Sequence, residues 1–369
     1  MDIFLSASSG TEEVLRDEVF ELGMKGAKTA GRGVRLAGSR RDAWKLCLYS
    51  RIAQRVMVPA ARFQAPDEAS LYAGVHGVNW YRYAGPGQTL GVSAFCHDSA
   101  LTHSGFVALK TKDAVVDRIR DECGDRPDVD RRDPDLKLFV HLVRNRATVY
   151  LDLSGAPLFQ RGYRREAGPA PLKETLAAAL LRFSEWDGES PLADPMCGSG
   201  TIPIEAGLQA GNMPPGVLRE QFGFERWRCH GCREQEEMAA LRSEAFRRAH
   251  RQSPTLIAAD ADADALEVAR RNARLARVRI RFRHTPIEKL QLGGRPGTVV
   301  VNPPYNERLA ADEAFYRRIT AAFSRMHGWR VCVLSGSPEL ERIMPLVPAR
   351  RYSVHNGALP CEVLVYDIP

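Results

Sequence analysis

Strict alternation of apolar and polar residues is the clearest pattern in the chain and runs from residue 138 to residue 153. Leu138, Val140 and Leu142 occupy every second position, and a polar Arg-Asn-Arg turn follows at 144–146. Residues 147–153 then alternate again, with apolar side chains at 147, 149, 151 and 153. A period of two places these side chains on one face of an extended segment. The pattern therefore predicts a β-hairpin with one buried face.

Helical spacing and short apolar runs predict a mixed α/β organisation for the first third of the chain. Thr11 is followed by two glutamates, which is typical of a helix N-cap with acids in the first turn. The predicted elements are a strand over 2–6, a helix from Thr11, a helix from about 41 to 50, a strand over 51–63 and a helix over 107–121.

Residues 154–171 interrupt the pattern with Gly, Pro and Arg, so we place a domain boundary there. Apolar residues recur at helical spacing from 172 to 183, and strands and helices alternate from there to the end. This alternation predicts a parallel sheet with crossover helices. The Arg- and Glu-rich stretch 217–252 is predicted to be a solvated helical insertion.

Length and composition agree with a soluble protein of two or three domains. The chain has 369 residues, of which 44% are hydrophobic and 26% charged, which excludes disorder, collagen-like repeats and a disulfide-stapled miniprotein. No apolar run is long enough for a membrane span. The short N-terminal apolar stretch has no basic residue before it, so we do not predict a secretory signal peptide. We expect a cytoplasmic location.

Charge and cysteine content narrow the partners only slightly. Lys and Arg total 52 against 45 Asp and Glu, a net charge of +7 that favours anionic partners such as nucleic acid but also fits a GC-rich genome.

Cys229 and Cys232 flank His230, and a structural zinc would need two more ligands at comparable spacing. We expect reduced thiols and no metal.

The first chemical motif is ADPMCGSGT at 193–201, in which a short apolar strand ends in Asp194. A small-residue turn follows, and Gly198 and Gly200 allow the backbone to pass close to a ligand. The motif lacks the third glycine of a dinucleotide fingerprint and the lysine of a P-loop, which argues against nucleotide phosphates. A tight turn between strand and helix is the alternative interpretation.

The second motif is the apolar strand 256–259 followed by Asp260. An acid at this position can accept both hydroxyl groups of a ribose. Asp262 and Asp264 read better as helix-start residues. Together with the first motif, Asp260 indicates an adenosine-containing cofactor that needs no pyrophosphate site.

The third motif, TVVVNPPY at 298–305, is the sharpest. A β-branched strand places Asn302 at its carboxyl end, and two prolines stiffen the loop that follows. The amide oxygen of Asn302 and the carbonyl of Pro303 can both accept hydrogen bonds from an exocyclic amine, which draws the lone pair of the nitrogen out of conjugation. Tyr305 can stack on the base that carries the amine. A stiffened loop after a buried strand is the alternative.

The order DPMCGSGT, AADAD and NPPY resembles S-adenosylmethionine-dependent methyltransferases of the Rossmann-like class that act on amino groups. Nearly the whole chain resembles the bacterial THUMP-domain 23S rRNA guanine-N2 methyltransferases, on residues 108–120, 150–164, 170–181, 301–309 and 352–369. Some members carry a second, fused methyltransferase unit, which we do not expect here.

The resemblance implies an α/β fold in which a Rossmann-like class I methyltransferase domain is preceded by small α+β ferredoxin-like and THUMP domains. The implied bounds are 1–50 for the ferredoxin-like part, 51–155 for the THUMP RNA-binding domain, 156–170 for the linker and 171–369 for the methyltransferase domain.

The same resemblance implies the roles of individual residues. The cofactor S-adenosylmethionine is expected at Asp194, Pro195, Met196, Cys197, Gly198, Ser199, Gly200, Thr201, Asp260, Ala261, Pro286 and Ile287. The target amine is expected at Asn302, Pro303, Pro304 and Tyr305. One departure is Pro286, which stands where the family usually has an acid that reads the adenine amine. Adenine recognition then depends on Thr285 or on backbone near Ile287.

The implied activity is N2-methylation of a guanine in 23S rRNA, without a metal or a covalent enzyme intermediate. Candidate RNA contacts are Lys110, Lys112, Arg161, Tyr163, Arg164 and Arg165, which combine cations with an aromatic ring. The alternatives are guanine N2 in tRNA, a protein glutamine amide, adenine N6 in DNA, and a non-catalytic RNA-binding protein. The sequence leaves the oligomeric state open.

Overall fold

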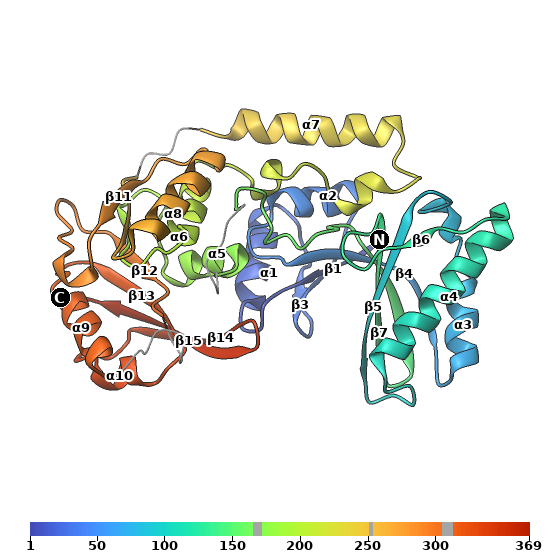
Figure 1. Ribbon diagram of the computed structural model, residues 1–369, viewed down its shortest axis with the longest axis horizontal. Coiled ribbons are helices and arrows are strands. Elements are labelled where there is room, and N and C mark those ends of the chain that lie inside the picture. The colour runs from blue at the N-terminus through green and yellow to red at the C-terminus, as the bar shows by residue number, and fades with distance from the viewer. Residues whose placement is uncertain (165–171, 251–253, 305–312) are drawn as a thin grey trace.

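The computed structural model describes residues 1–164, 172–250, 254–304 and 313–369. Within these residues the chain forms an eight-stranded and a seven-stranded β-sheet. Figure 1 shows an elongated molecule, with the seven-stranded sheet at one end and the outer half of the eight-stranded sheet at the other. No described helix is both long enough and apolar enough to cross a membrane.

The first 152 residues build the eight-stranded sheet, in the order β2-β3-β1-β4-β8-β7-β5-β6. Its strands are β1 (Asp2–Ser6), β2 (Lys28–Thr29), β3 (Gly33–Ala37), β4 (Arg55–Gln64), β5 (Thr89–His97), β6 (Asp128–Val129), β7 (Leu136–Val143) and β8 (Arg146–Asp152). The helices are α1 (Glu12–Glu21), α2 (Arg40–Tyr49), α3 (Glu68–His76) and α4 (Ser104–Cys123), with a short 3₁₀ turn η1 (Trp80–Arg82). Strand β4 pairs with β1 on one side and with β8 on the other, so the sheet is continuous.

Most elements predicted in this part are confirmed. Strands β7 and β8 form the predicted hairpin, and Arg144 and Asn145 at its turn have φ of 51° and 57°. Helix α4 contains the predicted 107–121 segment, whereas β4 begins at Arg55 instead of residue 51. The predicted cap is wrong in detail, because the Thr11 hydroxyl donates to the Ser8 carbonyl (2.8 Å) and does not cap α1.

The seven-stranded sheet has the order β11-β10-β9-β12-β13-β15-β14. Its strands are β9 (Leu192–Asp194), β10 (Leu256–Asp260), β11 (Arg281–His284), β12 (Thr298–Val301), β13 (Arg330–Ser335), β14 (Arg350–Asn356) and β15 (Leu359–Asp367). The helices are α5 (Glu174–Phe183), α6 (Thr201–Ala210), α7 (Cys232–Arg248), α8 (Ala263–Leu275), α9 (Glu313–Phe323) and α10 (Glu339–Ile343). Three 3₁₀ turns are η2 (Pro215–Leu218), η3 (Gly223–Arg226) and η4 (Ile287–Lys289). The predicted parallel sheet is confirmed over β9 to β13, and β15 runs antiparallel to β13.

Helices cover both faces of this sheet, as crossover connections require. Alternate residues of the strands point to opposite sides: Val300 and Cys332 pack with α5 and α6, whereas Val299 and Val331 pack with α9. The strands are therefore buried on both faces, and ligands can reach the sheet only at the ends of its strands.

Helix α7 crosses from the second part of the chain to the first. Figure 1 shows it lying along one long edge of the molecule, and Met238, Leu241 and Ala245 are buried in the core of the eight-stranded sheet. Arg40 on α2 pairs with Glu234 on α7 (2.7 Å). The prediction of a merely solvated insertion was wrong for this buried face of α7.

Candidate functional site

Asp194, Asp260 and Asn302 come together at one edge of the seven-stranded sheet. Asp194 ends β9, Asp260 ends β10, and Asn302 follows β12 directly. Both β10 and β12 pair in parallel with β9, so these three residues come from adjacent strands. The strand order reverses beside β9, and such a switch point is where open α/β sheets bind ligands.

The loop between β9 and α6 is fixed to the end of β10. The N–H of Gly198 donates to the Asp260 carboxylate (2.8 Å), and the N–H of Cys197 donates to the Ala259 carbonyl (3.0 Å). Gly200 has φ of +81°, a left-handed conformation that glycine adopts without strain. Asp260 therefore shapes the loop and lies beside it.

Two further side chains hold the same loop. The Asn272 amide on α8 donates to the Ser199 carbonyl (3.0 Å), and Arg164 donates to the Thr201 hydroxyl (2.7 Å). Sequence reasoning missed Asn272, whose only signal was a buried-face position on α8. Asp262 caps α8 through the N–H groups of the next turn, as predicted. The loop is thus held in place by β10, by α8 and by Arg164.

Two carboxyl groups, those of Asp194 and Asp260, lie close together at the site. Burial raises the pKa of the Asp194 carboxyl well above its usual range, and the neighbouring Asp260 carboxylate acts in the same direction. The Met196 N–H donates to Asp194 (3.2 Å) and opposes this shift. No described Arg or Lys side chain pairs with either group, so Asp194 favours its neutral form and a positively charged ligand at this edge would favour its ionised form.

Cys197 in the same loop has no nucleophilic character. Its side chain is buried, and burial raises the pKa of the thiol well above its ordinary value. A neutral buried thiol is inert. The cysteine is part of the packing between the loop and α8.

The Asn302 side chain has an unfilled hydrogen-bonding capacity at this edge. Its amide oxygen is buried and has no hydrogen-bond partner among the described residues. Pro303 is buried, and Pro304 is half-buried. A buried acceptor without a donor costs free energy, so a ligand that supplies an N–H relieves that cost. Tyr305 lies outside the described residues.

The position expected to read adenine lies next to Asp260. The Thr285 N–H donates to the Asp260 carbonyl (3.0 Å), and Pro286 precedes the short turn η4. Pro286 has neither an N–H nor a side-chain acceptor. Ile287 is buried in the core around α9, and its backbone is the nearest alternative contact.

The predicted RNA contacts at Arg161 and Tyr163 are wrong in this structure. Both side chains are 1% exposed. Arg161 pairs with the Glu205 carboxylate (3.5 Å) and donates to the Arg51 carbonyl, and the Tyr163 hydroxyl donates to Glu205 (3.2 Å). Glu205 lies on α6, far along the chain, so no local sequence pattern indicates this burial. These residues join the two parts of the molecule.

The other predicted RNA contacts are more accessible. Arg164 is half-buried, pairs with Glu174 (3.4 Å) and holds Thr201, as described above. Lys110 and Lys112 on α4 are half-buried and pair with Glu68 (2.5 Å) and Asp113 (2.6 Å). Arg165 lies outside the described residues.

The Cys-His-Cys cluster contributes to packing. His230 contacts the edges of Trp44 and Phe224, each with ring centroids 5.5 Å apart. Across the described part of the chain, no group of three or more His, Cys, Asp or Glu side chains is placed to hold a metal ion.

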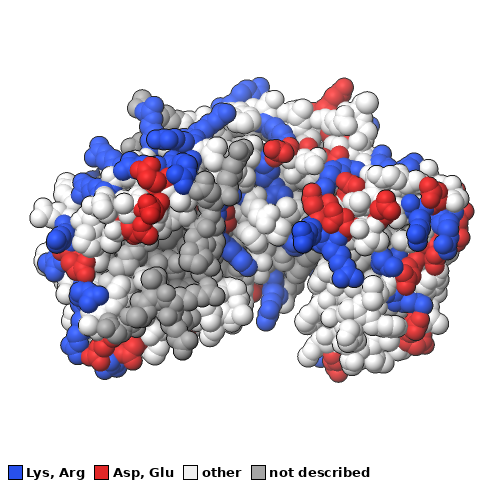
Figure 2. Space-filling model, in the orientation of Figure 1, with Lys and Arg blue, Asp and Glu red and all other residues white. Residues whose placement is uncertain are grey.

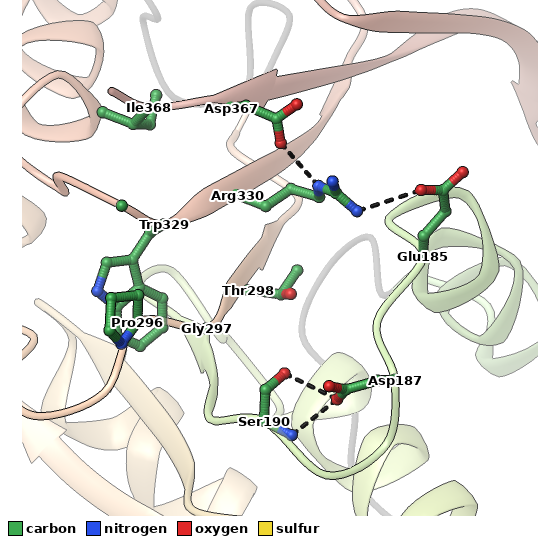
Figure 3. A pocket seen from close by; sticks show the side chains of 11 residues that line it. Glu185, Asp187, Ser190, Pro296, Gly297, Thr298, Trp329, Arg330, Asp367 and Ile368 are labelled. Carbon is green, nitrogen blue, oxygen red and sulfur yellow. Dashed lines mark hydrogen bonds and ion pairs between the residues drawn. The ribbon is translucent and has the colours of Figure 1, made fainter.

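A surface hollow lies at the opposite edge of the same sheet. Thr298 and Arg330 begin β12 and β13, and both line this hollow (Figure 3). Arg330 is engaged by Asp367 (2.8 Å) and Glu185 (3.2 Å). Its cation is therefore already neutralised, and the hollow is separate from the candidate site.

Comparison with known proteins gives the family. Residues 161–364 match the model of the RMKL-like methyltransferase domain. A curated relative from Methylococcus capsulatus, named ribosomal RNA large subunit methyltransferase K/L, is 40% identical over 100% of this chain and 51% of its own length. The chain belongs to the RMKL-like methyltransferase family. It spans about half the length of the curated relatives it matches.

The N-terminal part matches two further family models. Residues 2–57 match the RlmL ferredoxin-like domain, and residues 65–152 match the THUMP domain. The expected order of ferredoxin-like, THUMP and methyltransferase domains is thereby confirmed. One sheet runs through both N-terminal regions, because β4 pairs with β1 on one side and with β8 on the other.

Solved structures agree with the fold over the full length. A protein from Listeria monocytogenes, described as a predicted N6-adenine-specific DNA methylase, is 30% identical with a TM-score of 0.87, covering 100% of this chain and 96% of that one. SMU.472, solved in complex with SAH, is 27% identical with a TM-score of 0.88, covering 100% of this chain and 98% of that one.

Proposed function

We propose that this protein transfers a methyl group from S-adenosylmethionine to the N2 amine of a guanine in 23S rRNA. The observation that carries the proposal is the buried, unpartnered amide oxygen of Asn302 at the carboxyl end of β12. The ribosomal RNA named for the curated relatives supports the substrate. The structure solved with SAH supports the cofactor.

The residues at the sheet edge suit this cofactor. Asp260 and Asp194 lie together without a described cation, so a ligand that carries ammonium and sulfonium groups, as S-adenosylmethionine does, compensates the Asp260 carboxylate and favours ionisation of the buried Asp194 carboxyl. We assign the methionine part to the loop 194–201, the ribose to Asp260 with Ala261, and the adenine to the backbone around Pro286 and Ile287. When bound, the cofactor supplies an electrophilic methyl group.

The chain's own residues hold and activate the target amine. Asn302 Oδ1 and the Pro303 carbonyl accept the two N–H bonds of the guanine N2 group, which draws its lone pair out of the ring and toward the methyl group. Pro303 and Pro304 restrict the loop, so the acceptors are in place before the base arrives. Catalysis then consists mainly of orientation and preorganised hydrogen bonding. We assign stacking on the base to Tyr305.

The N-terminal regions supply the grip on RNA. We keep the division of the chain into 1–50, 51–155, the linker 156–170 and 171–369 as part of the proposal, with Lys110 and Lys112 as phosphate contacts on the THUMP part. A guanine must leave its base stack for its amine to reach Asn302. Transfer should therefore be faster on free or partly assembled rRNA than on intact large subunits.

Replacing Asn302 tests the central assignment. Asn302→Ala removes the acceptor, and turnover should fall by at least about 10²-fold. Asn302→Asp keeps an acceptor oxygen at the same place and should retain measurable transfer. Binding of S-adenosylmethionine, measured by calorimetry, should stay the same in both variants. Unchanged turnover of Asn302→Ala would contradict the proposal.

The substrate is tested with labelled S-adenosylmethionine and unmodified 23S rRNA and tRNA in parallel, followed by digestion to nucleosides. N2-methylguanosine from rRNA alone supports the proposal. If N2-methylguanosine forms in tRNA alone, the proposed reaction is supported but the substrate is tRNA and not 23S rRNA. Absence of label in both RNAs, with the cofactor still bound, would overturn the proposal in favour of a protein or DNA amine.

A further inference from the structure

Among the described residues, no helix covers one side of the outer half of the eight-stranded sheet. In β7, Leu138, Val140 and Leu142 are buried, and the intervening residues point to the other side. Figure 1 shows α3 and α4 on the buried side of β5 and β7. We call the opposite side the open face; its members, fixed by strand register, include Phe95, His97, Phe139, His141, Thr148 and Tyr150.

Aromatic rings stack on one another across the open face. Phe95 on β5 lies against His141 on β7, with ring centroids 5.6 Å apart and planes within 15°. His97 continues the stack beyond Phe95, at 6.4 Å and 24°. Phe139 and Tyr150 form a second contact nearby, at 6.5 Å. The strands thus present a ring-covered surface.

The outer part of this surface is exposed, whereas Tyr150, towards the middle of the sheet, is buried. Phe95 is 49% exposed, and His97 and His141 are also exposed. Burial of a phenylalanine contributes about 1.5–3 kcal/mol. Because Phe95 is half exposed, the fold does not gain the full contribution there, and a polar residue would be equally compatible with the strand. A flat aromatic ring held on a rigid strand is suited to another flat ring.

Basic side chains surround the rings. Arg35 lies directly opposite Phe4, whose ring contacts Tyr150 (6.0 Å), and Lys28 lies opposite Arg35. The same face carries Arg62, Lys137 and Arg146 by register. Burial, and next the Arg35 guanidinium, lower the pKa of His141, so the positive field of Arg35 extends to the ring stack.

The carboxylates on this face are already engaged. Asp2 pairs with Arg62 (2.5 Å), and Asp152 pairs with Arg55. The remaining cations give the open face a positive balance, which complements phosphates. In Figure 2 the surface is indented between the two lobes, and Lys and Arg side chains lie on both sides of the indentation.

Stacking rings with flanking cations are the chemistry of unpaired nucleic acid. Bases in a duplex are stacked on each other and offer no face to a protein ring, whereas unpaired bases do. A protein partner would gain little from stacked rings surrounded by cations. The combination therefore favours single-stranded RNA.

We propose that the open face binds an unpaired segment of the RNA substrate, with bases stacked on Phe95 and His141 and phosphates near Arg35 and Arg146. It is a second RNA site, on a different sheet from Asn302. The identification of the ligand as part of a methylation substrate rests on the proposed function; the stacking surface itself does not.

The test compares ring shape at one position. Phe95→Leu keeps an apolar side chain but cannot stack on a base, whereas Phe95→Trp keeps a ring that can stack. The matched control is Phe106→Leu, because Phe106 is 38% exposed on α4, in the helical layer. The probe is a fluorescent, unstructured RNA of about 12 nucleotides, with a duplex of equal length beside it.

We expect Phe95→Leu to weaken binding of the single strand about tenfold, as loss of one stacked base does, and Phe95→Trp and Phe106→Leu to bind as the original protein. Arg35→Gln should lower the salt dependence of log K by about 0.7, the value for one phosphate contact. Equal affinities of Phe95→Leu and Phe106→Leu, or stronger binding of the duplex, would overturn the proposal.

The same variants separate this proposal from the proposed function. Single-strand binding that depends on Phe95, in a protein that methylates neither RNA, keeps the open face and overturns the enzyme assignment. If the protein methylates 23S rRNA but single-strand binding is unaffected by Phe95→Leu, the enzyme assignment is kept and the proposal for the open face is overturned. Thermal unfolding of each variant confirms that the fold is retained.

Discussion

Glu174 is an acid in an unfavourable place. It lies at the start of α5, is 2% exposed, and has the Arg164 guanidinium 3.4 Å away as its partner. Burial raises the pKa of its carboxyl from an ordinary value near 4.5 to about 7, although Arg164 opposes the shift. The residue that pairs with Arg164 is therefore partly protonated at neutral pH, directly beside the side chain that holds Thr201.

This shift has a definite sign for stability. Between about pH 4.5 and 7 the folded protein binds more protons at Glu174 than the unfolded chain, so stability falls as pH rises. Glu174→Gln removes this contribution, up to about 3 kcal/mol. Urea unfolding at pH 5 and pH 8 should show that the free energy of unfolding falls less between these two pH values in Glu174→Gln than in the original protein. Glu236 is exposed, and the control variant Glu236→Gln should keep the pH dependence of the original protein. The expectation would be contradicted if the free energy of unfolding of Glu174→Gln had the same pH dependence as that of Glu236→Gln.

Residues at strand ends could be predicted from the sequence, and buried partners could not. Asp194, Asp260 and Asn302 each follow an apolar run, so a parallel sheet brings them together whatever else the fold contains. Arg161 carries a charge in a Gly- and Pro-rich linker and looks like a surface residue. Its burial depends on Glu205, 44 positions later, and no local pattern announces that contact.

At the scale of elements, α6 packs closely because Gly207 lacks a side chain. A methyl group there would lie 2.1 Å from Val278 Cγ1, in the segment that follows α8. The loop 194–201 leads into the other end of this helix, so the contact with Val278 sets how near α6 lies to the segment after α8. Glycine in the middle of a helix is otherwise unfavourable.

Gly207→Ala should therefore destabilise the protein, even though alanine favours helix. Overpacking costs about 1–3 kcal/mol, and the helix preference returns up to about 1 kcal/mol. The double variant with Val278→Ala should recover part of the loss. Gly293→Ala is the control, because nothing lies within 4 Å of the added methyl group. Chemical unfolding compares the three; equal stability of Gly207→Ala and Gly293→Ala would refute the packing argument.

Elements with a strong period were predictable, and irregular ones were not. The β7–β8 hairpin and α4 follow from alternation and helical spacing. Strand β5 was missed because Gly91, Ser93 and Ala94 dilute its pattern, and its exposed Phe95 and His97 do not read as one buried face. Helix α7 was predicted as a helix, but its few buried residues hide among charges.

On the scale of the whole molecule, buried charges join the two parts. Arg161, Arg51 and Glu205 lie between the N-terminal sheet and α6, and Arg51 donates to the carbonyls of Leu208 (3.2 Å) and Met213 (2.9 Å). Burial lowers the pKa of Arg51 to about 10, which leaves it charged at neutral pH. The buried Arg161 cation thus depends on Glu205, and the carboxyl groups of Glu205 and Glu18 both stabilise the Arg51 cation.

Glu205→Gln should be strongly destabilising. Removing one partner of a buried ion pair leaves an uncompensated charge, at a cost of about 3–5 kcal/mol. Asp98→Asn, which breaks an exposed pair with Arg144, should change stability little. Denaturant unfolding measures both. A loss for Glu205→Gln no larger than that for Asp98→Asn would show that the cluster does not hold the parts together.

The crossing of α7 has a consequence for the order of biosynthesis. The N-terminal core begins with Ile3, yet Phe222, Phe224, Met238 and Leu241 complete it. A ribosome must therefore translate β9 and α6 of the second sheet before the first core can close. Until then the nascent chain exposes the face of α2 that receives α7, and the two halves mature together instead of one after the other.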